Sequence, residues 1–485
     1  MKKLYIKISI IIITITGLAS CSDDFVNVDS NDVNSEDFFN SEEDYQNALI
    51  GAYDLLQSTY INVMLGEIAS DNTLAGGESA TDVIGIQEID DMIHTPVNSN
   101  LRDLWGWMYG GVNRANFILE FQDKIDFSGK DQVIAQARFL RAYYYFELVK
   151  WFGDIPLAID KQILFGEESS YERSPASEVY SLIEQDLIYA ADKLPSVPAE
   201  TGRVTKGAAQ ALLGKAYLYQ DKFSEAAQEL ETLIQSGTYS LVTDYNTIFE
   251  EEGENNIESV FEVQYTDLEG AGFGCLQCSE GNIAVGFSGV RNYEGPDFTS
   301  GFSFNVPVQE LVNAYDSGDT RLESTILDIE EFVSTRPDVT YNLGAEHTGY
   351  FNKKYIPYAD DIVLQDQNIN RSNNYRAIRY VDVLLMAAEA NLQASVQKDN
   401  PQDLLDQVRD RAFGDSNNRI TASLENILTE RRLELAGEGH RFFDQVRTGS
   451  AASIPGFFTN KNEVFPMPRI EIELAGNRWE QNQGY

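Results

Sequence analysis

Apolar residues recur with a helical period over most of the first half of the chain. From residue 131 to residue 152 they follow one another at steps of three and four, which places them on one face of an α-helix. Gly153 and Pro156 end this pattern, because neither residue continues a helix well. Further helices are predicted on the same grounds over 43–59, 100–121 and 177–194.

Residues 206–235 contain two helical patterns separated by a short turn at 221–223. Gly214 on the first helix is small, so the second helix, which carries Ala226 and Leu230, can approach it closely. The short turn makes the two helices antiparallel. This spacing resembles a tetratricopeptide repeat.

The helical period fades between residues 239 and 353, where glycines and aromatic residues become frequent. Residues 259–265 alternate between apolar and polar side chains, as a strand does. Residues 270–304 combine many glycines with aromatic side chains. A long irregular segment in a compact protein is usually functional or disordered, and the many aromatic residues disfavour disorder. Helical patterns return over 375–393, 403–412 and 424–437, and the tail 463–485 is predicted to be extended.

The N-terminus has the pattern of a secretory signal peptide. Lys2, Lys3 and Lys7 precede an apolar run from residue 8 to residue 19. That run is too short to span a bilayer, which takes about 20 residues. Residues 1–20 are therefore predicted to be a signal peptide that is cleaved off.

The segment Leu18-Ala19-Ser20-Cys21 resembles the bacterial lipobox. The resemblance implies cleavage before Cys21 and attachment of lipid to its sulfur, with acyl chains such as palmitate; two or more chains anchor a protein stably. An ordinary secretory peptide with a chance cysteine is the alternative. Ser22-Asp23-Asp24 looks like the acidic stretch that directs lipoproteins of Bacteroidetes-type bacteria to the cell surface, and residues 21–35 would then be the lipidated tether.

The charge balance restricts the partners. The chain has 77 acidic and 36 basic residues, for a net charge of −41 at pH 7. Such a chain repels nucleic acid and anionic lipid headgroups, so we expect no nucleic-acid partner and no polyanionic ligand on a broad basic patch. Solubility is the simplest interpretation of this balance, and a site for a basic ligand is the alternative.

Two further cysteines, Cys275 and Cys278, lie in the glycine-rich segment. A lone pair at this spacing cannot complete a tetrahedral zinc site, and His94, His347 and His440 are all distant in sequence. We therefore expect no metal and no cofactor. A small disulfide loop fits an oxidising compartment better than two free thiols, although both states remain open.

Several sequence blocks together resemble the SusD/RagB-like family of outer-membrane nutrient-uptake lipoproteins of the Bacteroidetes type. Arg379-Tyr-Val-Asp-Val-Leu-Leu-Met386 and Glu438-Gly-His-Arg-Phe-Phe-Asp444 are among the most distinctive. The remaining blocks occur in the family's order over nearly the whole chain, at 137–148, 152–157, 203–206, 388–390, 430–435, 446–449, 465–468 and 481–485.

The resemblance implies one mainly helical domain over residues 36–485. Its scaffold would be about four tetratricopeptide-like helix pairs, with minor β-structure; the repeats would lie mainly in 36–235 and 375–440, and irregular ligand loops in 239–353. It also implies a partner, a SusC-like TonB-dependent receptor in the outer membrane. The lipoprotein would face the cell exterior, held there by its lipid, and would deliver an oligosaccharide, or in RagB-like members a peptide, to that receptor.

Seven residues are candidate ligand contacts. Sugar rings stack on aromatic planes, and Asp, Asn and Arg side chains suit paired hydroxyl groups. Each residue also has an ordinary structural interpretation, namely helix caps and turns for the polar residues near the N-terminus, packing on a neighbouring repeat for the tryptophan, and loop packing for the others. The candidates are Asp71, Asn72, Asn98, Trp107, Phe287, Arg291 and Tyr293.

We expect a binding protein and not an enzyme. His440 beside Glu438 and Asp444 has the residue types of an acid–base site, but opposite charges on a strongly helical segment usually form ion pairs. A glycoside hydrolase needs two carboxylates about 5–10 Å apart across a cleft, and no motif isolates such a pair. The sequence thus favours capture of a neutral oligosaccharide such as a β-glucan, with a peptide-capturing lipoprotein as the main alternative and a hydrolase or a pure protein-interaction scaffold as less favoured ones.

Overall fold

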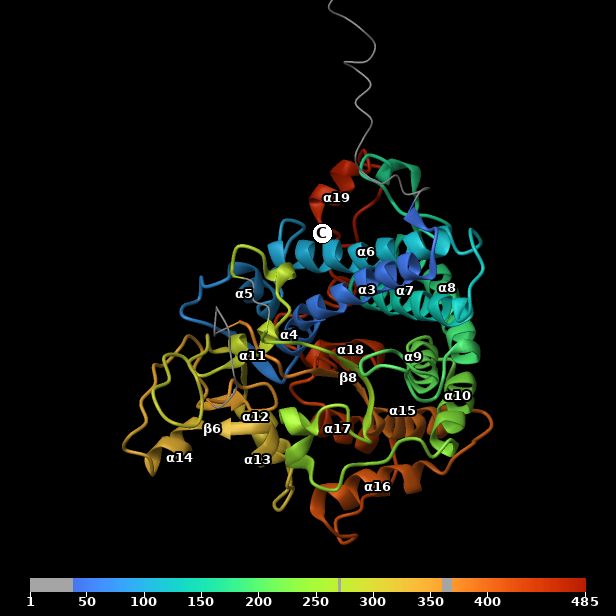
Figure 1. Cartoon of the computed structure of the whole chain (residues 1–485). Coiled ribbons are helices and arrows are strands. Elements are labelled where there is room, and N and C mark those ends of the chain that lie inside the picture. The colour runs from blue at the N-terminus through green and yellow to red at the C-terminus, as the bar shows by residue number, and fades with distance from the viewer. Residues whose placement is uncertain (1–37, 269–271, 360–368) are drawn as a thin grey trace, which may run out of the picture.

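The computed structural model of the chain describes residues 38–268, 272–359 and 369–485 (Figure 1). The predicted signal peptide, Cys21 and the predicted tether all lie outside these residues. The predicted fold class is confirmed, because helices dominate the described chain and strands are few and short.

Long antiparallel helices form the scaffold. In Figure 1 they run along the top, down the right side and along the bottom, around a centre that contains β8 and α18. Neighbours along this path pack on one another, from α6 through α7, α8, α9, α10 and α15 to α16. Their bounds are α6 Ser99–Glu120, α7 Lys130–Phe152, α8 Ala176–Lys193, α9 Lys206–Leu218, α10 Phe223–Gln235, α15 Tyr380–Gln393 and α16 Pro401–Phe413.

The helix pair α9–α10 shows why this spacing needs a small residue. A Cβ atom added to Gly214 would lie 2.5 Å from Leu230 Cδ2, closer than any real contact. The helices therefore touch through the glycine, as the repeat-like pattern predicts. The predicted helices over 100–121, 131–152 and 177–194 also occur, as α6, α7 and α8, with ends shifted by about one residue.

Shorter helices complete the scaffold around these pairs. The predicted helix over 43–59 divides into an α-helix and a 3₁₀ segment. Two further helices, α17 and α18, carry the charged block near the C-terminus. The bounds are α3 Glu42–Asp54, η2 Leu55–Thr59, α4 Tyr60–Ile68, α5 Ile84–Asp90, α11 Ile283–Ser288, α12 Gln309–Ala314, α13 Leu322–Thr325, α14 Ile329–Ser334, α17 Leu424–Glu434, α18 Arg441–Arg447 and α19 Arg469–Leu474. The remaining 3₁₀ segments are η3 Glu168–Ser170, η4 Tyr245–Phe249, η5 Glu251–Gly253, η6 Leu276–Cys278 and η7 Ala451–Ser453.

Among the described residues the strands form four antiparallel pairs, β1–β5, β2–β3, β4–β8 and β6–β7. In the pair β1–β5, Thr73 lies opposite Pro307 and Gly76 opposite Phe304. The bounds are β1 Thr73–Gly76, β2 Ile155–Pro156, β3 Arg173–Ser174, β4 Ser259–Val263, β5 Phe304–Pro307, β6 Ile326–Asp328, β7 Tyr350–Asn352 and β8 Tyr375–Arg379.

The prediction of one helix over 375–393 is wrong at its start, where residues 375–379 form strand β8. The strand supplies the partner that β4 needs, with Val263 opposite Tyr375 and Ser259 opposite Arg379. An isolated strand leaves its backbone groups unpaired, so this pairing outweighs the local helical pattern. The predicted extended tail also contains one short helix, α19.

An aromatic clasp, formed by Phe39 and its neighbours, fixes the first described residues to helix α6. The Phe39 side chain is fully buried, and its ring centroid lies 4.8 Å from that of Phe117 and 5.3 Å from that of Phe121. The Tyr45 hydroxyl donates to the Phe121 carbonyl oxygen. Ser41 then begins α3 with a capping box, in which its side chain and that of Asp44 each accept from the other's backbone N–H.

Candidate functional site

Three segments that are distant in sequence meet at the end of the sheet β1–β5. They are residues 76–84, 291–304 and 341–346, and we call their common surface the loop face. Gly77 N donates to the Ser303 carbonyl oxygen at 2.8 Å, and Ala345 N donates to the Gly77 carbonyl oxygen at 2.8 Å. The loop face lies beside α5 and α11 in Figure 1.

Arg291 is the polar centre of the loop face. Its Nε donates to Ser303 Oγ at 3.1 Å, and its Nη2 donates to the Phe302 carbonyl oxygen at 2.7 Å. Two carboxylates stand beyond it, with Asp82 Oδ2 at 3.4 Å from Nη2 and Glu78 Oε2 at 3.8 Å from Nη1. These contacts hold the guanidinium in one orientation, and Glu78 stays largely exposed. The surface therefore offers both hydrogen-bond donors, from Arg291, and acceptors, from Glu78 and Asp82.

Aromatic rings border the same surface. The Phe302 ring lies 5.6 Å from Phe273 and 5.7 Å from Phe287, and Phe287 stacks on Phe304 at 5.2 Å. Phe287 is buried, whereas 58% of Phe273 is exposed to solvent. Phe273 therefore presents an aromatic plane to solvent at the rim of the loop face, where a sugar ring could stack.

The cysteine pair lies just beyond Phe273. Cys275 and Cys278 form a disulfide, and the η6 turn that they close packs on η2. The covalent link closes a short turn that begins two residues after Phe273.

The other predicted contacts in this part of the chain are less accessible. Tyr293 is buried in a small apolar cluster, and its hydroxyl donates to Asp297 Oδ2 at 3.3 Å. Trp107 is half-buried on α6, with its ring 6.0 Å from that of Tyr60. Asn98 is buried as the N-cap of α6, where its Oδ1 accepts from Leu101 N at 3.1 Å. The structure brings Phe287 and Arg291 together, and it places Asn98 and Trp107 on the neighbouring helix.

Asp71 lines a separate cavity of about 810 Å³, together with Thr73 and Leu74 of strand β1, and Asn72 is its neighbour in the chain. Arg441 binds Asp71 with two hydrogen bonds, from Nε at 2.7 Å and Nη2 at 2.9 Å. Asn72 is fully buried and its Oδ1 accepts from Arg432 Nε at 2.8 Å. Both side chains thus join β1 to the C-terminal helices. Burial, with the nearby carboxylates of Glu346 and Asp91, raises the pKa of Asp90 in this cavity to about 7.

The buried carboxyl of Glu67, which accepts from Asn72 Nδ2 at 3.4 Å, should make the stability of the protein depend on pH. Burial raises the pKa of this carboxyl to about 7, although Gly437 N donates to it at 2.6 Å. A carboxyl with a raised pKa in the folded state binds more protons there than in the unfolded chain between about pH 4.5 and pH 7, so stability should rise as pH falls through this window. Glu67→Gln should remove this gain, which is on the order of 3 kcal/mol.

The measurement is chemical denaturation of both proteins from pH 8 to pH 5. The wild-type free energy of unfolding should increase relative to that of Glu67→Gln as pH falls. Parallel pH profiles for the two proteins would show that the Glu67 pKa is not raised.

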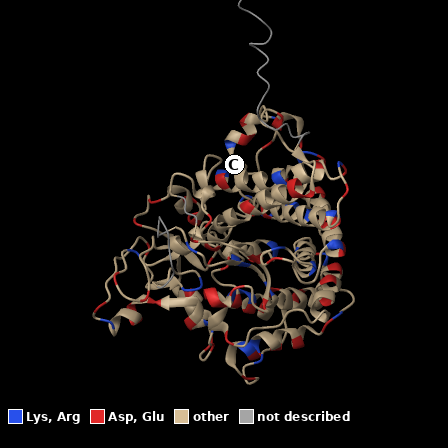
Figure 2. Ribbon diagram, in the orientation of Figure 1, with Lys and Arg blue, Asp and Glu red and all other residues tan. Residues whose placement is uncertain are grey.

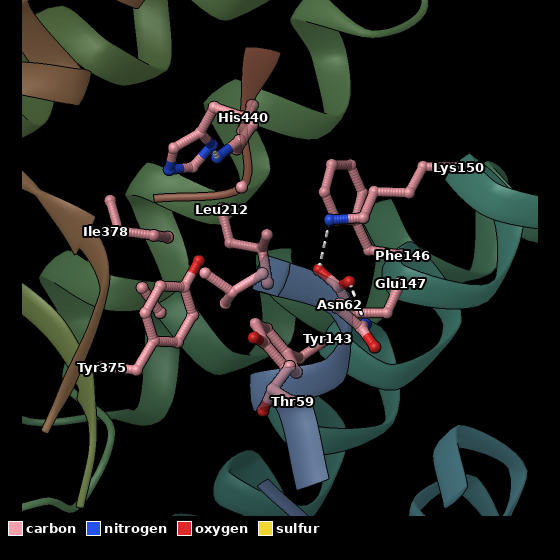
Figure 3. Close-up of a pocket in the computed structure, with 14 residues that line it drawn as sticks. Thr59, Asn62, Tyr143, Phe146, Glu147, Lys150, Leu212, Tyr375, Ile378 and His440 are labelled. Carbon is pink, nitrogen blue, oxygen red and sulfur yellow. Dashed lines mark hydrogen bonds and ion pairs between the residues drawn. The ribbon is translucent and has the colours of Figure 1, made fainter. Parts of the chain in front are cut away.

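A second internal space is lined by Asn62, Glu147, Lys150 and His440, among other residues (Figure 3). Its volume is about 20 Å³, which is room for about one water molecule and far too little for a sugar ring. This space therefore belongs to the polar interior of the scaffold.

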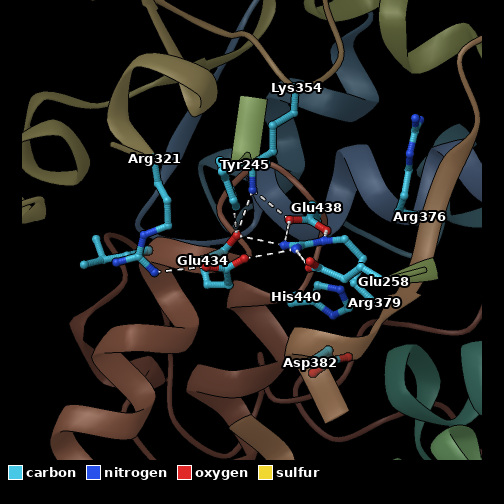
Figure 4. A network of polar contacts seen from close by, with 12 residues as sticks. Tyr245, Glu258, Arg321, Lys354, Arg376, Arg379, Asp382, Glu434, Glu438 and His440 are labelled. Atoms are coloured by element: carbon cyan, nitrogen blue, oxygen red, sulfur yellow. Dashed lines mark hydrogen bonds and ion pairs between the residues drawn. The ribbon is translucent and has the colours of Figure 1, made fainter. Parts of the chain in front are cut away.

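The block Glu438–Asp444 lies in a buried ion network and has the structural role that the sequence predicts (Figure 4). Arg379 donates to Glu438 Oε1 at 2.7 Å and to Glu258 Oε1 at 2.7 Å, while Lys354 Nζ lies 2.7 Å from Glu438 Oε1. Burial lowers the pKa of His440 to about 3, so this imidazole is neutral near pH 7. Glu438 and Asp444 are buried and paired with Arg379, Lys354, Arg431 and Arg447, as expected of structural ion pairs.

Acidic side chains outnumber basic ones over the whole molecule, and the two signs are interspersed on helices and loops alike (Figure 2). Within the described ranges no group of three or more His, Cys, Asp or Glu residues is arranged to hold a metal ion. No helix in that same part of the chain is long and apolar enough to span a membrane.

The sequence interpretation did not single out Glu78, Asp82, Phe273 or Phe302 as candidates. An exposed phenylalanine next to a Cys-X-X-Cys segment is the one signal that could have indicated Phe273. Glu78 and Asp82 become candidates only because they lie beside Arg291, which is more than 200 residues away in sequence and close only in the fold.

Two family models match the chain. One, described as the SusD family, matches residues 313–485, and the other, described as "Starch-binding associating with outer membrane", matches residues 24–218. SusD-like protein P2 of Formosa agariphila is 25% identical, over the full length of both chains.

Solved structures agree with these matches. A laminarin-binding SusD-like protein is 35% identical, with a TM-score of 0.84 over 92% of this chain and 100% of its own. Surface glycan-binding protein A from Bacteroides thetaiotaomicron, in complex with laminarihexaose, is 28% identical, with a TM-score of 0.81 over 91% of this chain and 99% of its own.

Proposed function

This chain belongs to the SusD family, and on that premise we propose that it captures an oligosaccharide at the cell surface and delivers it to a SusC-like TonB-dependent transporter in the outer membrane. The proposed ligand class rests on the 35% identity to a SusD-like protein described as laminarin-binding, whose whole chain is covered. A second structural relative holds laminarihexaose. The expected ligand is therefore a neutral β-glucan.

The loop face is the proposed binding site. Phe273 offers a ring plane for a sugar, and Arg291 with Glu78 and Asp82 offers donors and acceptors for its hydroxyl groups. The acidic surroundings disfavour sulfated or uronate polymers, because each added negative charge would be repelled. Of the residues predicted from sequence, Arg291 has the position best suited to a direct contact with the ligand. Phe287 is buried and packs against Phe302.

The proposal includes membrane attachment through lipid on Cys21 and orientation toward the cell exterior. The lipobox resemblance and the family model described as associating with the outer membrane support it. It does not include catalysis, and the buried, paired carboxylates of Glu438 and Asp444 support that part of the proposal. A peptide ligand remains the alternative, and binding of peptides without binding of glucans would favour it.

Two substitutions test the site. Phe273→Ala removes the exposed ring, and Arg291→Ala removes the guanidinium that holds Asp82 and Ser303. Phe273→Ala should weaken binding of laminarihexaose by up to about tenfold, because an aromatic stacking contact is worth about 0.5–1.5 kcal/mol. Arg291→Ala should weaken it by roughly tenfold or more, because a hydrogen bond to a charged group is worth about 1.5–3 kcal/mol. Isothermal titration calorimetry measures the affinity.

A matched control is Phe165→Ala. Phe165 is 89% exposed and lies in the 157–170 segment, outside the loop face, so its loss should leave laminarihexaose affinity unchanged. Wild-type affinity in both loop-face variants would place the site elsewhere. The same incubations should produce no new reducing ends, and their appearance would indicate a hydrolase.

A further inference from the structure

A groove crosses the body at residues 201–203, away from the loop face. It consists of two hollows of about 280 and 270 Å³, which share Thr201, Gly202, Arg203 and Glu262 as lining residues. We call this feature the Arg203 groove. Ligand pockets usually measure about 300–1,000 Å³, so either hollow alone is small and the two together reach that range.

Arg203 divides the two hollows and is held in place. Its guanidinium lies 5.0 Å above the Tyr53 ring, and its Nε donates to Glu200 Oε2 at 3.1 Å. Val204 N donates to the Tyr53 hydroxyl at 3.1 Å, which fixes the ring beneath the guanidinium. A planar cation on an aromatic ring therefore forms the ridge of the groove, with a fifth of the Arg203 side chain exposed.

Amide and carboxylate groups line the walls. Asn255 and Gln264 form a reciprocal amide pair, with bonds of 3.0 and 3.1 Å, and Glu262 accepts from Asn255 N at 3.0 Å. Asn255 stays exposed and keeps one amide hydrogen and one lone pair for a further partner. Fixed amides, an arginine and exposed hydroxyl groups such as that of Thr201 suit a polyhydroxylated ligand better than an apolar one.

The groove borders the segment that carries the loop-face aromatic. Gln57 and Glu280 line one hollow, and Tyr265 donates its hydroxyl hydrogen to the Gln57 carbonyl oxygen at 2.8 Å. Gln57 belongs to η2, on which the disulfide turn η6 packs, and Phe273 lies just before that turn. The Arg203 groove is therefore connected to the segment that carries Phe273 through η2 and the disulfide turn η6.

We propose that the Arg203 groove is a second glycan-binding subsite, which binds a further stretch of the same β-glucan polymer that the loop face holds. It rests on the glycan-capture function above and adds a contact that only a long chain can make. A second contact on one polymer binds with a high effective concentration, so it increases affinity for the polymer without changing that for a short oligosaccharide.

The test compares laminarin with laminarihexaose in calorimetry. Thr201→Trp should fill the groove from an exposed position, and Arg203→Ala should remove its ridge. Both should lower laminarin affinity by about fivefold or more and leave laminarihexaose affinity within about twofold of wild type. Thr232→Trp, at an exposed position of α10, is the matched control and should change neither affinity.

Each result decides between the two sites. Wild-type laminarin affinity in both Thr201→Trp and Arg203→Ala would overturn the second subsite while leaving the loop face intact. Phe273→Ala should reduce affinity for both ligands, which distinguishes the loop face from the groove. A wild-type protein that binds neither glucan would overturn the β-glucan function and the groove together.

Discussion

Replacing Arg379 with methionine should lower the free energy of unfolding by about 3–5 kcal/mol, a large part of the roughly 5–15 kcal/mol typical of a folded protein. Arg379 is buried and binds three carboxylates, those of Glu258, Glu434 and Glu438. Methionine replaces only the aliphatic part of the arginine side chain, so three buried carboxylates lose the cation they share and keep only Lys354, Arg411 and Arg321 as partners. Uncompensated buried charge is far more costly than the loss of a hydrogen bond in water.

Chemical denaturation monitored by circular dichroism measures this effect. Arg419→Met is the matched control, because Arg419 forms an exposed pair with Asp410 and solvent screens such pairs. The control should unfold close to the wild-type midpoint. An Arg379→Met protein with the wild-type midpoint would show that the network does not stabilise the junction between β8 and α17.

Replacing Cys21 with alanine should abolish glucan uptake by cells and leave laminarihexaose binding in solution unchanged. The cysteine sulfur is the proposed point of lipid attachment, and without acyl chains the protein has no anchor that holds it beside the transporter. The binding residues are far along the chain from Cys21, so the affinity of the purified protein should not change.

Growth on laminarin, membrane fractionation and calorimetry together measure the three consequences. Asn27→Ala within the predicted tether is the control, and it should stay in the membrane fraction and support growth. Normal growth of the Cys21→Ala strain would contradict the role of the lipid. Loss of binding in the purified variant would contradict the independence of the anchor from the site.

The helices could be predicted from the sequence because their pattern is local. Apolar residues at steps of three and four locate α7 to within about one residue, and Gly214 predicts a close helix contact that Leu230 makes. Strand β8 could not be predicted in the same way. Its residues form a strand only because β4, more than 100 positions earlier, pairs with them.

The candidate site likewise combines features that local sequence predicts with features that depend on distant residues. Arg291 has the chemistry of a ligand contact, but its orientation depends on Asp82 and Ser303, which no local pattern connects to it. Asn98 has the same ambiguous chemistry, because an asparagine suits both a sugar and a helix cap, and the fold uses it as a cap. Exposure separates the two uses, and exposure follows from tertiary packing.

The aromatic clasp at Phe39 has a mechanical consequence for a protein held by its N-terminus. If lipid on Cys21 holds the protein, tension along the chain would reach the clasp before α3, because Phe39 is buried against Phe117 and Phe121 at the C-terminal end of α6. Because α6 packs along α7 and α3, the load passes into the body of the scaffold before it can unwind the first helix. Under the proposed attachment at Cys21, the clasp would therefore pass the load to the scaffold and leave α3 and the loop face undisturbed.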